Sequence, residues 1–401
     1  MSPCHVCRAP RVAVLLDFDR QPICNRFLAT PADEEYTHHL VMGQCQACGL
    51  VQLTNTPVPA EELKPRYEWV TYREPEEHLD RLADTISRLP GITKDSVLAG
   101  ISFKDDSLLE RMKARGFRHV WRIDLEKDLS VHDPGAGVET IQNRLDSARA
   151  AELGRRHGRP DVLVARHILE HAQDVRRFTS TLKTLLSPTG YLVLEVPDCT
   201  RALNTCDYTM LWEEHTLYFT PETFQGYCVF SGLSLLQFDV FPYVMENSLV
   251  GIGRFQEGLA PQFPTEHALR EETARVKGFA ERFGTQRQKL QQWLADFRTT
   301  QGKIALLGAG HLGCTFINLL ELTDYVEFIV DDHPNKQGLF MPGSRLPIRG
   351  SSALLTDDVR LCLLGLSPES EDTVIQRNAQ FLNRGGTFAS ILRGSKRALT
   401  I

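Results

Sequence analysis

The stretch Ser96–Asp124 has the sequence SVLAGISFKDDSLLERMKARGFRHVWRID, and it decides the fold. It begins with a short apolar strand, Val97–Ile101, passes through a polar turn into a helix with one apolar face, and ends in a second strand that closes with Asp124. In nucleotide-binding α/β units, an acidic residue at this place accepts hydrogen bonds from the two ribose hydroxyls of an adenosine-containing cofactor. The stretch therefore predicts an α/β domain that binds such a cofactor, with Asp124 among its contacts.

The turn between this strand and its helix, Gly100–Asp106, has the sequence GISFKDD. Turns that let a cofactor approach the backbone normally carry several glycines, because glycine leaves room and permits unusual backbone angles. Only one glycine is present here, and Lys104 can pair with Asp105 and Asp106 as part of an ordinary surface turn. The architecture therefore favours a cofactor site more strongly than the turn does.

The length and the composition narrow the class of protein. The 401 residues predict two to four domains with cores of their own, and the net charge of -6 argues against a nucleic-acid partner. No apolar run approaches the roughly 18 residues of a membrane span, and the first residues, MSPCHVC, do not resemble a signal peptide. We therefore expect a cytoplasmic protein whose ten cysteines are reduced, so that paired cysteines are candidates for metal before disulfides.

Two CxxC pairs in the first fifty residues predict a structural zinc site, formed by Cys4, Cys7, Cys45 and Cys48. Two such pairs supply four thiolates to a tetrahedral ion and leave no open position for chemistry on it. Free thiols or a redox pair are the alternative. Cys24 has no such partner, and we interpret it as a small buried residue.

Three aromatic residues lie close together between this module and the α/β domain, in the segment 67–72 with the sequence YEWVTY. Such a cluster more often packs domains together than binds a substrate, and Trp69 is its candidate for a substrate contact. An amphipathic helix is expected to follow at Glu76–Leu89.

The alternation of strands and helices continues beyond Asp124. It predicts a third strand at Val138–Ile141, a fourth at Asp161–Ala165, a helix at Asp174–Leu186, a strand at Tyr191–Val196, and an antiparallel pair at Leu233–Phe241 and Ser248–Phe255. A parallel sheet that ends in such a pair is the arrangement of class I methyltransferases, which use S-adenosylmethionine. Apolar residues three or four apart over Thr265–Thr300 then predict a connecting helix or helix pair, in which two glycines weaken a single unbroken helix.

The last hundred residues carry a dinucleotide fingerprint. The strand Lys303–Leu307 is followed by GAGHLG, by a helix, and by a strand that ends in Asp331. Backbone amides at a helix start suit a pyrophosphate, either of NAD or of a substrate. The candidate residues for this anion are Gly308, Gly310, His311 and Gly313, with Lys336 as a further phosphate contact or a surface charge. The alternative is a tight turn in a Rossmann-like unit that only packs.

The order of these modules resembles the family of zinc-binding sugar C-methyltransferases, which methylate nucleotide-linked deoxysugars in antibiotic pathways. The resemblance extends almost end to end. Besides the two CxxC pairs, it is carried by RHILEH at Arg166–His171, LWEEH at Leu211–His215, DDHPNKQG at Asp331–Gly338, and PGS at Pro342–Ser344. It implies a class I methyltransferase-like Rossmann domain between an N-terminal zinc-binding module and a C-terminal Rossmann-like domain.

The resemblance also implies catalytic roles. A carbon beside a ketone becomes a nucleophile when a base removes its proton. The family's catalytic Glu-His pair matches Glu214, as the orienting carboxylate, and His215, as the base. Two residues before that glutamate the family has a tyrosine, whereas Trp212 here has no hydroxyl. His171 matches a histidine that lies near the reacting sugar. The alternative for His215 is a histidine that only satisfies a loop hydrogen bond.

The cofactor residues follow from the same comparison. The acidic residue and the two glycines of the family's loop fall on Gly100, Ser102 and Asp106, and Asp124 and Arg166 complete the predicted S-adenosylmethionine site. Asp106 adds a side chain and a negative charge where the amino-acid part of the cofactor is expected to lie.

Three hypotheses therefore stand. The first is an S-adenosylmethionine-dependent C-methyltransferase that acts on a keto sugar nucleotide or a related phosphorylated carbonyl compound. The second is an NAD-dependent enzyme that uses the C-terminal loop, and the third is a catalytically altered subunit that binds a nucleotide sugar. The expected domain limits are 1–75 for zinc binding, 76–260 for the methyltransferase-like domain, 261–300 for the connecting helix and 301–401 for the C-terminal domain.

Overall fold

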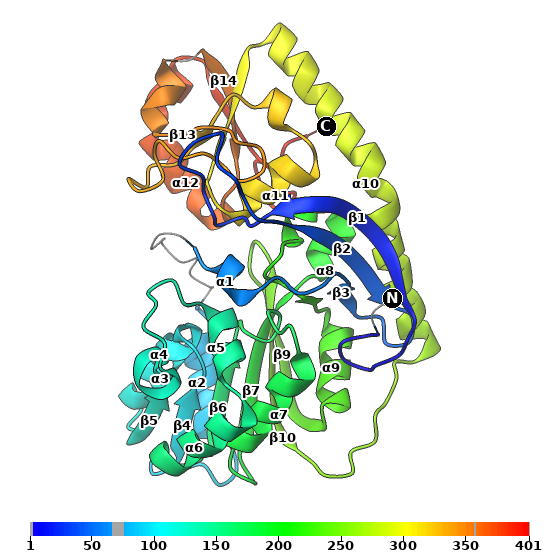
Figure 1. Ribbon diagram of the computed structural model, residues 1–401, viewed down its shortest axis with the longest axis vertical. Helices are drawn as coiled ribbons and strands as arrows, with labels where there is room; N and C mark the ends of the chain where they lie inside the picture. Colours follow the sequence, from blue (N-terminus) through cyan, green and yellow to red (C-terminus); the bar gives the residue numbers. More distant parts are fainter. Residues whose placement is uncertain (1–2, 66–75, 357, 401) are drawn as a thin grey trace.

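The computed structural model describes residues 3–65, 76–356 and 358–400. Three sheets form the framework (Figure 1). The aromatic cluster at 67–72, with Trp69, lies outside the described residues. Among the described helices, none combines the length and the apolar character that a membrane crossing requires.

The N-terminal sheet has four strands in the order β1-β2-β3-β8, and all its pairs are antiparallel. Its members are β1 (Val12–Pro22), β2 (Thr37–Cys45), β3 (Val51–Leu53) and β8 (Leu217–Tyr218), and a short helix, α1 (Ala60–Leu63), follows β3. The fourth strand, β8, comes from far along the chain, directly after the predicted catalytic residue His215. The zinc-binding part therefore shares a sheet with the segment that carries this histidine.

The middle sheet has six strands in the order β5-β4-β6-β7-β10-β9. The strands are β4 (Val97–Gly100), β5 (His119–Arg122), β6 (Val162–Arg166), β7 (Tyr191–Asp198), β9 (Leu233–Phe241) and β10 (Asn247–Phe255). The first four are parallel, and β10 lies antiparallel between β7 and β9. The predicted parallel sheet with an antiparallel pair at one edge is confirmed, and the sheet order changes direction between β4 and β6.

Helices cover both faces of this sheet. They are α2 (Leu79–Ser87), α3 (Asp106–Ala114), α4 (Leu125–Leu129), α5 (Val138–Arg144), α6 (Ser147–His157), α7 (Val175–Leu185) and α9 (Pro221–Phe230), while α8 (Thr200–Thr205) lies in the core shared with the C-terminal domain. Alternate residues of β6 enter opposite cores, with Val162 and Val164 on the side of α2 and α3, and Leu163 and Ala165 on the side of α6 and α7. This alternation places both faces of a parallel strand in apolar surroundings.

One predicted strand of this domain is wrong. Val138–Ile141 is the first turn of helix α5, not a strand. The β-branched residues of VETI favoured a strand, but the buried residues Val138 and Ile141 are three apart and lie on one helix face. Tertiary packing overrides the weak preference of these residues for a strand, so the segment forms a helix.

The segment Thr265–Thr300 forms a single helix, α10 (Glu266–Thr300), despite Gly278 and Gly284. The hydroxyl of Thr265 caps its first turn, and Val276, Phe279, Leu290 and Leu294 are buried on its inner face. Figure 1 shows this helix along one side of the molecule, from the middle domain to the C-terminal domain. Burial of its inner face compensates for the roughly 1 kcal/mol that each glycine costs in a helix.

The C-terminal sheet has five strands in the order β13-β12-β11-β14-β15, and all its pairs are parallel. Its members are β11 (Lys303–Leu307), β12 (Ile329–Val330), β13 (Ile348–Arg349), β14 (Val359–Leu364) and β15 (Thr387–Ser390), joined by helices α11 (His311–Leu319), α12 (Pro368–Arg377) and α13 (Ala379–Asn383). The predicted strand, loop and helix at GAGHLG are confirmed as β11, its turn and α11.

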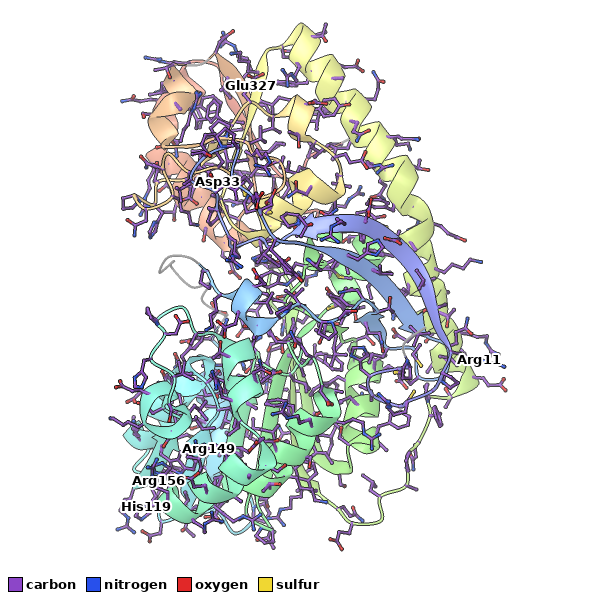
Figure 2. All side chains as sticks on the ribbon, in the orientation of Figure 1. Arg11, Asp33, His119, Arg149, Arg156 and Glu327 are labelled. Carbon is purple, nitrogen blue, oxygen red and sulfur yellow. The ribbon has the colours of Figure 1, made fainter. Side chains whose placement is uncertain are left out.

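The hairpin of β1 and β2 connects the two larger domains. Figure 2 shows Arg11, before β1, on the side of the middle domain, and Asp33, in the loop between the strands, against the C-terminal domain. Arg345 donates to the carbonyl oxygen of Asp33 at 3.0 Å, and the amide of Gly343 donates to Glu35 at 3.0 Å. The zinc-binding module therefore contacts both domains between which the site lies.

Candidate active site

The four predicted zinc ligands lie together. Cys4 and Cys7 come from the N-terminal turn, Cys45 ends β2, and Cys48 lies in the turn toward β3. The sulfurs of Cys4 and Cys48 are 3.7 Å apart, those of Cys7 and Cys45 are 3.5 Å apart, and all four lie within 4.8 Å of one another. A tetrahedral zinc ion with bonds of about 2.3 Å to sulfur requires separations of roughly 3.8 Å. The four residues fit a structural zinc ion.

The chemistry of this cysteine group agrees with its geometry. The amide of Ala47 donates to the sulfur of Cys45 at 3.4 Å. Gly49 follows with a φ of +79°, a conformation that favours glycine. The turn is therefore shaped to hold a thiolate.

The predicted catalytic residues come from two loops, one after a strand of the middle sheet and one before the short strand β8 of the N-terminal sheet. His171 follows β6, and the segment of Trp212, Glu214 and His215 precedes β8. The ring centroids of His171 and His215 are 4.6 Å apart, and those of His215 and Trp212 are 5.0 Å apart. Three of the predicted site residues, His171, Trp212 and His215, therefore lie together.

His215 is held in surroundings that keep it neutral. Burial, followed by the positive potential of neighbouring His171 and His311, lowers the pKa of His215 well below its ordinary value. A neutral imidazole has a lone pair that can accept a proton. Among the described residues, neither ring nitrogen has a hydrogen-bond partner, so the expected pairing of His215 with Glu214 remains a prediction.

The two glutamates before His215 contact the zinc-binding module. The backbone amide of Cys24 donates to Glu213 at 2.6 Å, and its thiol donates to the same carboxylate at 3.3 Å. The side chain of Asn25 donates to Glu214 at 3.1 Å. Burial raises the pKa of Glu213 to about 7, and burial together with the charges of Glu139 and Glu213 raises the pKa of Glu214 well above its ordinary value. Residues 24 and 25 belong to the site, and no spacing in the sequence pointed to them.

A cavity of about 70 Å³ adjoins these residues, between the middle and the C-terminal domain. Its lining includes Trp212 and His215 on one side and His311 and Leu312, at the start of α11, on the other. Trp212 and His311 stack with centroids 4.4 Å apart. Residues from two domains that the sequence treated separately thus meet at one cavity.

The glycine loop of the C-terminal domain is shaped largely by its own packing. A Cβ atom at Gly308 would lie 2.5 Å from the carbonyl oxygen of Gly365, and one at Gly313 would lie 2.4 Å from that of Gly308. A Cβ atom at Gly310 would meet nothing described within 4 Å, so this residue opens the loop. The first and last glycines serve the tight turn, while the middle one leaves room for a ligand.

Asp331 and Lys336 hold this loop in place. One oxygen of Asp331 accepts from the amide of Ala309 at 3.0 Å and from Lys336 at 3.3 Å, and Lys336 also donates to the carbonyl oxygen of Ala309 at 2.6 Å. The carboxylate that an NAD enzyme would offer to the ribose is therefore bound to the loop itself. The predicted contact between Lys336 and a phosphate remains a prediction.

The turn after β4 is held by a buried carboxylate. Asp105 accepts from the amides of Ile101 at 2.7 Å, Ser102 at 2.8 Å and Arg166 at 2.9 Å, and it thereby joins β4 to β6 at the point where the sheet order changes direction. Burial raises the pKa of Asp105 to about 6. A Cβ atom at Gly100 would lie 2.8 Å from that of Asp105, so this glycine makes room for the loop's own aspartate.

Three other predicted cofactor residues make hydrogen bonds or ion pairs within the protein. Arg166 is buried, donates to Glu195 at 2.5 Å, and donates to the carbonyl oxygen of Lys104 at 2.6 Å. Asp106 pairs with Arg122 at 2.7 Å. Asp124 lies beyond β5 and caps α4 through one oxygen, which accepts from two amides. The contacts of Asp124 and Asp106 with S-adenosylmethionine remain predictions.

Family comparisons cover most of the chain. Residues 4–63 match a zinc binding domain, residues 81–237 match a methyltransferase domain, and residues 254–392 match a C-methyltransferase C-terminal domain. A curated relative, the C-methyltransferase NovU of Streptomyces niveus, is 24% identical over 97% of this chain and 94% of its own length. The NAD-dependent alternative receives no support from these matches.

Solved structures resemble parts of the chain. One is an O-methyltransferase family protein from Burkholderia thailandensis, with 16% identity, a TM-score of 0.29, and coverage of 45% of this chain and 58% of that one. Another, from the same organism, is 1,6-didemethyltoxoflavin-N1-methyltransferase, with 15% identity, a TM-score of 0.30, and coverage of 45% and 80%.

The three domain matches follow one another in the order that the sequence predicted, and the curated relative spans all of them. The chain thus combines a zinc binding domain, a methyltransferase domain and a C-methyltransferase C-terminal domain, is similar to a C-methyltransferase over nearly its whole length, and is a methyltransferase.

Proposed function

We propose that this enzyme transfers the methyl group of S-adenosylmethionine to a carbon beside a ketone in a nucleotide-linked sugar or a related phosphorylated carbonyl compound, with His215 as the base. The observation that carries this proposal is the cavity in which His215 of the middle domain and the start of α11 in the C-terminal domain meet. One compound that carries both a ketone and a diphosphate can reach both sides of it.

The chemistry asks two things of the protein. A base must remove the proton beside the ketone, and the neutral imidazole of half-buried His215 is suited to this task. S-Adenosylmethionine, when bound, supplies an electrophilic methyl group to which the resulting carbanion forms its new bond, and S-adenosylhomocysteine leaves. The second task is to hold the substrate so that its acidic carbon, and not an oxygen, faces the base.

The C-terminal domain supports the second task. The amides at the start of α11 carry partial positive charge, and the side chain of His311 lies beside them at the cavity. Gly310 leaves open space at this turn. We propose that a diphosphate binds here, on the side of the cavity opposite His215, and that Gly308 and Gly313 shape the turn.

The test uses the full-length, zinc-loaded protein. It is incubated with S-adenosylmethionine that carries an isotope-labelled methyl group and with a panel of nucleoside diphosphate keto-deoxyhexoses, and the product is examined by mass spectrometry and NMR for a new carbon–carbon bond. His215→Asn should lower turnover by roughly 100-fold or more, because a positioned base contributes at least that factor. His132→Asn is the control, since His132 is exposed and pairs only with Glu126. Methylation at oxygen, or equal turnover by His215→Asn, would contradict the proposal.

A further inference from the structure

A second carboxylate–histidine pair lies beside His215. Glu139 of α5 and His171 after β6 are joined by a hydrogen bond of 2.6 Å between a carboxylate oxygen and Nδ1. Both side chains are about nine-tenths buried. This bond is the shortest contact that either residue makes among the described side chains, and the sequence did not point to Glu139 because its segment was taken for a strand.

The hydrogen bond fixes how His171 carries its proton. An ionised carboxylate only accepts, so the neutral imidazole must carry its hydrogen on Nδ1 and its lone pair on Nε2. The ring is then held in a state that is ready to take a proton on Nε2. Carboxylates that bind a histidine in this way commonly set both its orientation and its basicity.

The residue before α5 supports a specific placement of Glu139. Gly137 caps the helix with a φ of -101°, which any residue can adopt, so its backbone does not require glycine. A Cβ atom there would lie 3.0 Å from the second oxygen of Glu139. The glycine therefore leaves space for this carboxylate in the orientation that reaches His171.

We propose that Glu139 is a positioning residue that prepares His171 to take over the proton that His215 removes from the substrate. The inference rests on the proposed function, in which His215 is the base. A nitrogen of His171 and a nitrogen of His215 lie within 4.8 Å, a separation that one bridging water can span. The proton moves from the substrate carbon to His215 and then to Nε2 of His171, where the positive charge faces Glu139.

The surroundings of the two histidines explain the direction of this transfer. His215 is close to His171 and His311 and feels the charges of Lys104 and His167, all of which disfavour a proton on it. His171 is hydrogen-bonded directly to Glu139 of α5, while Glu170 lies within 4.8 Å of both histidines and Glu214 lies within 4.8 Å of His171. The hydrogen bond to Glu139 therefore distinguishes His171 from His215, which has no such bond to a carboxylate among the described residues.

The first test reads the tautomer of His171 without any substrate. Full-length protein with isotope-labelled histidine is studied by nitrogen NMR, and His171→Gln assigns the resonance. We expect wild type to carry hydrogen on Nδ1, and Glu139→Leu to shift His171 toward hydrogen on Nε2. Glu126→Leu is the matched control, because Glu126 also faces a histidine Nδ1, in His132, but both are exposed to water. Hydrogen on Nε2 in wild type would overturn the proposal, even if Glu139→Leu did not fold.

The second test uses turnover. Glu139→Gln keeps a hydrogen-bond acceptor but removes the charge, and it should lower kcat by roughly 10- to 100-fold with little change in KM. Glu139→Asp should restore part of the loss, which a purely structural role for the side chain would not predict. Unchanged kcat in Glu139→Gln would refute the transfer. If wild type itself turns over none of the panel, the proposed function fails, while the tautomer of His171 is still measured.

Discussion

Trp212 of the middle domain stacks on His311 of the C-terminal domain, with ring centroids 4.4 Å apart and an angle of 24° between the planes. The two residues come from opposite sides of the cavity, and no other stacked pair among the described residues joins these domains there. The stack therefore fixes the distance between the proposed base and the proposed diphosphate site.

Replacement of Trp212 should affect substrate binding more than chemistry. An aromatic stack contributes about 0.5–1.5 kcal/mol, so Trp212→Ala should raise KM by roughly 2- to 10-fold, while Trp212→Phe should stay close to wild type. Steady-state kinetics with the substrate found above provide the measurement. Trp293→Ala is the control, because Trp293 stacks on Phe297 within α10. A fall in kcat at constant KM would instead assign Trp212 to the chemical step.

Loss of the zinc ion should loosen the site as well as the N-terminal module. Cys48→Ala removes one of four ligands, and we expect the purified protein to lose its zinc and its Tm to fall by roughly 5–10 °C. Metal analysis and thermal unfolding measure the two effects. Cys228→Ala, at a buried cysteine of α9 outside the cluster, should keep one zinc per chain. Full zinc content in Cys48→Ala would show that the four sulfurs are not a metal site.

The sequence predicted the elements of the fold well where their pattern was long or their motif had context. The strands and helices that flank Gly100, Asp124 and His311 lie where periodicity placed them. The strand prediction at Val138 was wrong because the β-branched side chains there favour a strand, whereas the two buried residues are three apart, which is the spacing of one helix face. Short segments of this kind are decided by the surface they pack against.

The site was predictable only in part, for a related reason. His171 follows β6 at the carboxyl edge of the parallel sheet, so its place at a ligand site follows from the fold. His215 precedes β8 of the N-terminal sheet, and the amide of Thr216 holds its segment near His171 by donating to the carbonyl oxygen of Glu170 at 2.8 Å. Cys24, Asn25 and Glu139 reach the site from a hairpin loop and a short helix, and only the packing of three domains brings them there. A single sequence carries no pattern for contacts between residues about 190 positions apart, such as Cys24 and Glu213.

Glu213 should make stability fall as the pH rises. Folding raises the pKa of its carboxyl from 4.5 to about 7, mainly through burial, so the folded state binds the proton more tightly than the unfolded chain does. The contribution of Glu213 to the free energy of unfolding is therefore complete below pH ~4.5, and it decreases by about 3 kcal/mol as the pH rises to ~7. Glu213→Gln removes this dependence. The free energy of unfolding of the variant should therefore increase relative to that of wild type as the pH rises over that range. Denaturant titrations at several pH values test this, with exposed Glu222→Gln as the control. A constant difference would contradict it.

Asp124 should contribute to the binding of S-adenosylmethionine through its charge. Asp124→Asn keeps the helix cap, because asparagine caps as well as aspartate, but it weakens the acceptor offered to the ribose. A charge-assisted hydrogen bond is worth about 1.5–3 kcal/mol, so Kd should rise by roughly 10-fold or more in calorimetry. Asp146→Asn, the same change at the cap of α6, should leave Kd unchanged. If both variants raised Kd by the same factor, the cause would be the altered helix caps and not a contact between Asp124 and the cofactor.

Asp106 should limit the affinity for the same cofactor. Its carboxylate pairs with Arg122 at 2.7 Å, and this partly exposed pair contributes at most about 1 kcal/mol to stability. Asp106→Gly frees both the space at the start of α3 and the guanidinium of Arg122, which can then donate hydrogen bonds to the carboxylate of the cofactor. We expect Kd for S-adenosylmethionine to fall by on the order of 10-fold, since one charge-assisted hydrogen bond is gained. The double variant Asp106→Gly with Arg122→Gln should lose this gain, because the freed cation is then absent. Weaker binding by Asp106→Gly alone would mean that Asp106 itself holds the ammonium group of the cofactor, so that the unusual turn is an adaptation for binding.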